Sequence, residues 1–379
     1  MAESISKRCA LIGTMLLLPL FCVGAETHLS PPSAETDNSQ LSLVQVAQLL
    51  GSDDLPSRMT AAGVAARHPE WSSELDEPLR KLAFDSKQPN ALRVAAIAAL
   101  APRLFPVDPH LLELVRSNLT LPNPPMERLN AARTLASLRL SDMQMLSVAK
   151  SVGEADALVL PTLLRSFLHT SNDAAGLSLV IALGKTPAAS SLSPDEAGRV
   201  LSHFSVGVRT AAKQMLEPLG VDLEKRQKHL EELAPLLEGG DPSRGRGVFF
   251  GKKAACSTCH NVSGSGPNGL MGPNLSQVGK VHNGPKLLES IIYPSAGSMP
   301  DFESFQVETT DGQNYSGVII RQTLDVIWLR ANDLAENKIE TKRIKTMAES
   351  SVPIMPKGIE EKLTKDELRD LLAYLKSLK

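Results

Sequence analysis

Two cysteines and a histidine stand next to one another in a chain that has few cysteines. The run Cys256-Ser257-Thr258-Cys259-His260 places two thiols three positions apart, with an imidazole directly after the second. Thiolates at this separation reach two vinyl groups on one side of a porphyrin, and the adjacent imidazole then falls beneath the iron. The spacing predicts one covalent haem c, attached through Cys256 and Cys259, with His260 as the proximal iron ligand.

Two other uses of a cysteine pair fit the sequence less well. A thioredoxin-like redox pair needs a preceding strand and a βαβ setting, and neither is indicated before Cys256. A zinc site needs two more Cys or His at ligand spacing, and His282 is the only later histidine. The remaining cysteines, Cys9 and Cys22, lie in an apolar stretch near the start of the chain, so a disulfide scaffold is not indicated either.

The segments on either side of the cysteine pair carry helix and turn signals. Gly240-Asp241-Pro242 predicts a helix that runs to about Phe250, because aspartate caps a helix and proline suits its first turn. Gly272-Pro273-Asn274-Leu275 predicts a turn. Thr364-Lys365-Asp366-Glu367 is close to a capping box and predicts a closing helix through Leu378.

With these signals, residues 240–275 resemble the N-terminal half of a class I cytochrome c, and Asp370–Leu375 resembles its last helix. The resemblance implies that the first and last helices cross where a glycine permits a close approach. The positions that match this crossing are Gly245, Phe249, Leu371 and Tyr374. It also implies that the carbonyl of Pro273 accepts the N–H of the proximal imidazole, which makes that ligand more electron-donating.

The sixth iron ligand is expected to be Met355. It lies in the constrained loop Val352–Gly358 directly before the last helix, where the cytochrome family places its axial methionine. A thioether ligand stabilises ferrous iron and raises the reduction potential. The other candidates, which are expected to serve as core, loop or surface residues, are Met271, Met299, Met347 and His282. A haem with two histidine ligands stays open as an alternative.

A β-rich insert separates the two halves of the cytochrome-like region, at about 304–343. Phe305–Thr309 alternates in polarity, Asp311-Gly312 is a hairpin signal, and three further short strands are expected at Tyr315–Ile320, Val326–Leu329 and Lys338–Thr341. Trp328 is expected in the strand core, and the alternative is that it faces the haem. With this insert, residues 243–378 resemble the haem-binding domain of the planctomycete and Verrucomicrobium type, which implies haem binding but defines no redox partner and leaves the propionate contacts unassigned.

The region 41–237 has the texture of a helical repeat. Apolar residues recur at helical spacing, and short runs that begin with arginine and contain paired alanines start at Arg58, Arg93 and Arg128, each 35 residues after the last. A fourth copy begins at Arg209, 81 residues further on. A two-helix period of this length is typical of HEAT-like α-solenoids, in which small alanines let neighbouring helices approach. An irregular Ala-rich bundle is the alternative.

The N-terminal segments are interpreted as targeting and linker sequences. Residues 1–25 resemble a signal peptide, with Lys7 and Arg8 ahead of an apolar run that is short for a membrane span, and 26–40 reads as a disordered leader. A retained signal would tether the protein to a membrane. Residues 238–240 form a linker. The expected location is the periplasm or another exported compartment.

Charge and composition limit the classes of function that the sequence supports. The chain has 40 Lys and Arg against 42 Asp and Glu, a balance that argues against nucleic acid as a partner. The helical region shows no plausible catalytic set. We expect a single-electron carrier whose helices dock a redox protein, such as a periplasmic dehydrogenase or another cytochrome. The alternatives are a haem peroxidase or gas sensor with a labile sixth ligand, and a helical scaffold.

Overall fold

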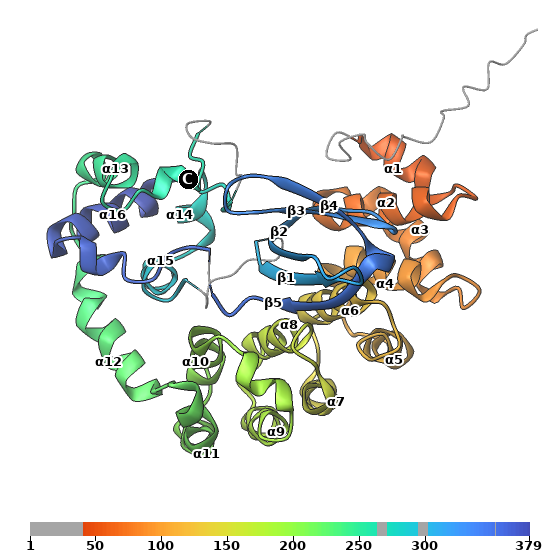
Figure 1. The fold of residues 1–379 in the computed structure, drawn as a ribbon, viewed down its shortest axis with the longest axis horizontal. Helices are drawn as coiled ribbons and strands as arrows, with labels where there is room; N and C mark the ends of the chain where they lie inside the picture. Colours follow the sequence, from red (N-terminus) through yellow and green to blue (C-terminus); the bar gives the residue numbers. More distant parts are fainter. Residues whose placement is uncertain (1–40, 264–270, 295–301, 353) are drawn as a thin grey trace, which may run out of the picture. The chain divides into compact units, whose positions relative to one another are not determined.

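The computed structural model describes residues 41–263, 271–294, 302–352 and 354–379. All of the described residues belong to one compact unit. These residues form sixteen α-helices and one antiparallel sheet of five strands (Figure 1). The expectation of a mainly helical protein with a small sheet toward its C-terminal end is confirmed.

Twelve helices occupy the region that the apolar spacing marks as helical. They are α1 (Leu43–Leu50), α2 (Leu55–Arg67), α3 (Ser72–Phe84), α4 (Asn90–Leu100), α5 (Pro109–Ser117), α6 (Pro125–Ser137), α7 (Asp142–Glu154), α8 (Leu160–Arg165), α9 (Asp173–Leu183), α10 (Pro194–Ser202), α11 (Val206–Leu216) and α12 (Leu223–Leu233). Polar side chains cap many of them, as at Ser42 and Ser141, where a glutamine three residues later completes a capping box.

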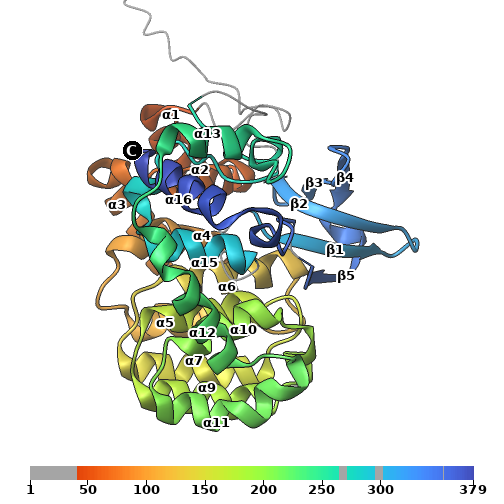
Figure 2. The ribbon, with the colours of Figure 1, turned by 90° about the vertical axis from the view of Figure 1, so that its left-hand side faces the viewer.

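These helices pack as two series. The even-numbered helices contact one another in succession from α2 to α12, while α7, α9 and α11 form a second series (Figure 2). Alanines of the repeated motif, such as Ala61 and Ala131, are fully buried between neighbouring helices, as their small size permits. The first three motif copies lie in α2, α4 and α6, but the copy at Arg209 lies in α11, in the other series. The fourth copy therefore does not continue the register of the first three.

The sheet consists of β1 (Ser304–Thr309), β2 (Asn314–Gln322), β3 (Val326–Arg330), β4 (Glu336–Glu340) and β5 (Ile344–Glu349), in the order β4-β3-β2-β1-β5. Strands β1 to β4 follow one another as a meander, and β5 returns to pair with the free edge of β1. The insert therefore extends beyond the expected end near residue 343, because β5 is a fifth strand. Trp328 of β3 is buried, but it lies beneath the side chains of Arg321 and Lys338 and outside the apolar cluster of the sheet's inner face, so it is not the core residue that was expected.

The remaining helices gather around a separate apolar cluster. They are α13 (Pro242–Phe250), α14 (Val278–Val281), α15 (Gly284–Ile292) and α16 (Lys365–Ser377). Their cluster contains Phe249, Leu371 and Tyr374. The inner face of the sheet instead shares one cluster with α1 to α11, through residues such as Phe305 and Met347. The insert thus packs on the helical region and not on the helices that flank it in sequence.

No helix among the described ranges is both long and apolar enough to cross a membrane. The expected signal segment, 1–25, and the expected leader, 26–40, lie outside the described residues.

Candidate haem-attachment site

The cysteine and histidine residues lie on a tight turn that follows α13. Ala255 has left-handed backbone torsions (φ 50°), and a short 3₁₀ turn, Cys256–Thr258, begins directly after it. The His260 N–H donates to the Cys256 carbonyl at 3.0 Å, which closes the segment on itself. The Leu275 N–H donates to the carbonyl of the buried Asn261 at 2.8 Å. This second bond holds the turn at residues 272–275 beside the histidine.

The imidazole of His260 is oriented by that neighbouring turn. Its Nδ1 lies 2.9 Å from the carbonyl oxygen of Pro273, the contact that the resemblance implies. A Cβ added to Gly272 would lie 2.7 Å from Cε1 of the ring, so the glycine backbone lies flat against the imidazole. Burial lowers the pKa of His260, while the Pro273 carbonyl favours the protonated ring and partly opposes that shift. Nδ1–H is therefore committed to Pro273, and Nε2 is the nitrogen left to act as a ligand.

Both thiols are free and partly buried. Cys256 and Cys259 form no disulfide, and Cys256 packs against the apolar cluster of α13, α15 and α16. Burial, with a smaller contribution from the neighbouring Cys259, raises the pKa of the Cys256 thiol to about 11. Cys256 consequently stays protonated at neutral pH, so this site lacks the stabilised thiolate of a thioredoxin-like redox pair.

Helices α13 and α16 cross at the point that the resemblance predicts. A Cβ on Gly245 would overlap the Asp370 carbonyl oxygen and lie 2.8 Å from Cβ of Tyr374. The rings of Phe249 and Tyr374 pack with their centroids 5.6 Å apart, and Leu371 is buried. Glycine is required at Gly245 because any side chain would force the two helices apart.

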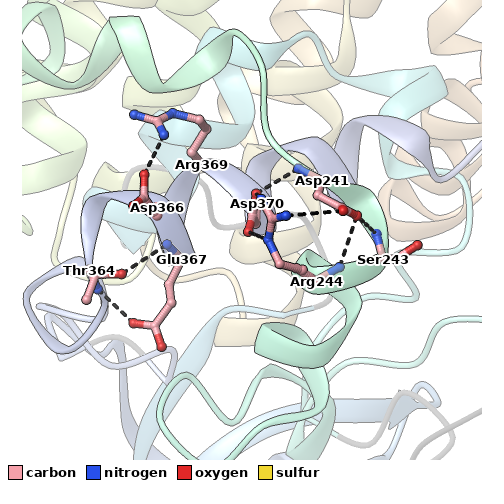
Figure 3. A network of polar contacts seen from close by, with 8 residues as sticks. All are labelled: Asp241, Ser243, Arg244, Thr364, Asp366, Glu367, Arg369 and Asp370. Atoms are coloured by element: carbon pink, nitrogen blue, oxygen red, sulfur yellow. Dashed lines mark hydrogen bonds and ion pairs between the residues drawn. The ribbon is translucent and has the colours of Figure 1, made fainter.

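A polar network fixes the ends of the same two helices (Figure 3). The Asp370 carboxylate accepts from the Asp241 backbone N–H at 2.7 Å and from Nε of Arg244 at 2.6 Å. The Arg244 hydrogen bonds are the main reason that the pKa of Asp370 is lowered. Asp241 caps α13, and Thr364 and Glu367 form the capping box of α16, as their sequences predict. The two helices that frame the cysteine segment are thus clamped together.

The candidate sixth ligand lies in the same part of the fold as the cysteines. Met355 is partly buried and packs against the apolar cluster that also receives Cys256. Met347 is a buried residue of β5 in the other cluster, and Met271 is buried beside the Gly-Pro turn. Both agree with the expectation of core positions. His282 is half-buried at the end of α14, and Met299 lies outside the described residues.

Gly272 was not singled out from the sequence. The Gly-Pro pair was visible there, but which of its atoms touch the imidazole depends on how the turn folds back. Among the residues that the structure describes, no three His, Cys, Asp or Glu side chains converge as a set that could hold a metal ion. A haem iron needs only two protein ligands, so this finding does not bear on haem.

In comparisons with known proteins, no family model matches this chain, and no curated protein matches it either.

Proposed function

We propose that this protein is an exported c-type cytochrome that carries one covalent haem and exchanges single electrons with a protein partner. The bound group would supply a one-electron Fe(III)/Fe(II) couple. The observation that carries the proposal is the hydrogen bond between Nδ1 of His260 and the Pro273 carbonyl, 2.9 Å long, directly after the paired thiols. It orients an imidazole as a proximal ligand is oriented, with Nε2 left over.

The residues present fit such a group in three respects. Cys256 and Cys259 are free thiols at the required spacing and would hold the porphyrin by thioether bonds. Burial keeps His260 neutral, which is the form that donates a lone pair to a metal. The third respect is the close α13–α16 crossing at Gly245, which gives the cysteine segment a rigid support.

Met355 is proposed as the second axial ligand. Its packing against the cluster that holds Cys256 supports this assignment. With both axial positions filled by protein side chains, the iron would not bind substrate, and the role left to it is electron transfer. The loop around Met355 would shield that side of the group from water.

The helical region, 41–237, is proposed to be a HEAT-like solenoid that docks the redox partner, a periplasmic dehydrogenase or another cytochrome. The succession of contacts among the even-numbered helices supports the repeat architecture. Leu177 and Ile181 on α9 and Val206 on α11 are exposed apolar side chains on one series of helices, of the kind that protein interfaces use.

The direct test is to express the full chain with cytochrome c maturation factors and to purify the exported product. After reduction, we expect the visible spectrum of a c-type haem. The intact mass should exceed that of the polypeptide by one haem. The matched control replaces both thiols, Cys256→Ser with Cys259→Ser, and should remove the covalent mass. A colourless wild-type product with no added mass would overturn the proposal.

Carbon monoxide separates the electron carrier from the haem enzyme or sensor. If a thioether occupies the sixth position, the ferrous protein should resist carbon monoxide and the ferric protein should show a far-red methionine–iron band. Immediate binding of carbon monoxide by the ferrous wild type would instead assign a labile sixth ligand and a catalytic or sensing role.

A further inference from the structure

The loop that carries Met355 is attached at both ends to the helical region. It follows β5 and comprises residues 350–352 and 354–358 of the described chain. At its start, Glu349 Oε1 lies 2.5 Å from Nη2 of Arg165, the last residue of α8. At its end, Nζ of Lys357 lies 2.9 Å from Oδ2 of Asp195, in the first turn of α10. Both anchors therefore come from α8 and α10, which contact each other.

The first anchor belongs to a buried ionic cluster. Arg165 also binds Glu196 of α10 and, at 2.7 Å, Glu303 just before β1. Arg133 of α6 binds the same Glu303 at 2.7 Å. The side chain of Glu303 is fully buried, and that of Arg165 is 11% exposed. Buried contacts of this kind hold their geometry firmly, because breaking one leaves the Arg165 charge short of a partner, and Glu349 accepts a hydrogen bond from Arg165 even when its carboxyl is protonated.

Residues of the helices and of the loop line one small cavity, which supports the attachment of the loop to α8 and α10. A cavity of about 30 Å³, roughly the room for one water molecule, lies between the helices and the start of the loop. It is lined by Pro161 and Glu196 from α8 and α10, and by Ser350, Val352 and Ile354 from the loop. The Ser350 N–H donates to the Ser304 carbonyl at 2.7 Å. The loop thus lies on the helices up to the residue before Met355.

The two side chains of the second anchor, Asp195 and Lys357, differ in their exposure to solvent. The Asp195 side chain is 10% exposed, whereas that of Lys357 is 48% exposed. Removal of the lysine would leave the buried carboxylate of Asp195 without its ion-pair partner. Because an unpaired buried charge is costly, the loop would shift so that water can solvate Asp195. Lys357 lies two residues after Met355, so a displacement there reaches the thioether directly. Beyond it, the chain enters the cluster of α13, α15 and α16 at Ile359.

The geometry points to a second role for the helical region: α8 and α10, acting through the Asp195–Lys357 pair and the Arg165–Glu349 pair, hold Met355 in position as an axial ligand. The inference rests on the proposed function. Asp195 and Lys357 are positioning residues, and the state of the helices sets the ligation of the iron. A partner that binds α8 or α10 would thereby alter the reduction potential.

The test uses the full-length haem protein and the variants Lys357→Gln, Asp195→Asn and Lys357→Arg. We expect the glutamine and asparagine variants to weaken the far-red methionine–iron band, to lower the midpoint potential and to let ferrous protein bind carbon monoxide. The arginine variant keeps the charge and should keep all three properties. Because both single changes break one pair, the double variant should add little to either alone.

Hydrogen exchange supplies a readout that does not depend on the haem. In Lys357→Gln, the hydrogen-bonded amides on either side of the pair, those of Ser350, Lys362 and Leu363, should exchange about tenfold faster, which corresponds to a loss of about 1.4 kcal/mol in closing the loop. The control is Lys342→Gln, which removes an exposed ion pair with Glu340 on the sheet. It should leave the band, the potential and loop exchange unchanged.

The possible failures are distinguishable. A wild-type chain without haem would overturn the proposed function and this inference with it. A haem-containing wild type whose band, potential and loop exchange are the same in Lys357→Gln and Asp195→Asn would overturn the inference alone.

Discussion

Two glycines of α13, two residues apart, should respond in opposite ways to the same substitution. A Cβ on Gly245 would lie 2.5 Å from the Asp370 carbonyl carbon and 2.8 Å from Cβ of Tyr374, both on α16. Neither contact can be relieved by rotating a side chain, because one atom is backbone and the other is fixed to it. A Cβ on Gly247 would meet nothing within 4 Å.

Comparing Gly245→Ala with Gly247→Ala isolates the free-energy cost of forcing α13 and α16 apart. Alanine is favoured over glycine inside a helix by about 0.5–1 kcal/mol, and this gain applies equally to both positions. Forcing an extra methyl group into a packed contact costs about 1–3 kcal/mol. Gly247→Ala should therefore stabilise α13 slightly, and Gly245→Ala should be less stable than Gly247→Ala by about 1–3 kcal/mol.

Native-state hydrogen exchange of α16 measures this difference locally. The predicted gap corresponds to exchange about 5- to 150-fold faster in Gly245→Ala than in Gly247→Ala for amides of Lys365–Ser377. Amides of β5 should be unaffected in both variants, because that strand packs in the other cluster. Equal or greater protection of α16 in Gly245→Ala would refute the argument that the close crossing requires glycine.

Three further predictions concern charge and the imidazole. Hydrogen bonds from Arg244 lower the pKa of Asp370. The stability that ionised Asp370 contributes is therefore complete above its unfolded pKa of ~3.9 and is lost as pH falls through its lower pKa in the folded protein. Asp370→Asn should remove this acid-dependent loss of hydrogen-exchange protection in α16, and an unchanged pH profile would contradict the prediction. Burial raises the pKa of Glu349 to about 8, so stability should fall as pH rises from ~4.3 toward 8. Glu349→Gln should flatten that fall in urea melts followed by tryptophan fluorescence, and an equal slope in both proteins would count against it. Gly272→Ala would press a methyl group onto the His260 ring and should reduce the haem-to-protein ratio of the exported product; a wild-type ratio would show that the ring has room.

The helices on either side of the cysteine segment were predictable because their signals are local. Asp241 and Thr364 cap α13 and α16 through hydrogen bonds to amides two or three residues later, so a few letters of sequence specify each helix start. The strands β1 to β4 were indicated for the same reason, by alternation and by the Asp311-Gly312 hairpin signal. The final strand, Ile344–Glu349, was not, because its pairing partner is β1, which lies far back in the chain.

The repeat shows which helix positions a 35-residue sequence period predicts correctly and which it does not. Three motif copies spaced by 35 residues do lie in alternate helices α2, α4 and α6, since equal chain lengths bring equivalent helices into register. The copy at Arg209 falls in α11, in the other series, because it lies 81 residues after Arg128, whereas two further periods of 35 residues would end at residue 198, in α10. Composition marks a helix as Ala-rich, but its position along the chain decides which series it joins.

The sequence by itself determined the chemistry of the candidate site, since the identities and spacing of Cys256, Cys259 and His260 are properties of one short segment of chain. Only the tertiary structure decided what surrounds that segment. It placed the Gly272 backbone against the imidazole, and it laid the insert on the helical region through Arg165, Glu303 and Glu349. Contacts between residues more than a hundred positions apart depend on how whole elements pack, and no local pattern encodes them.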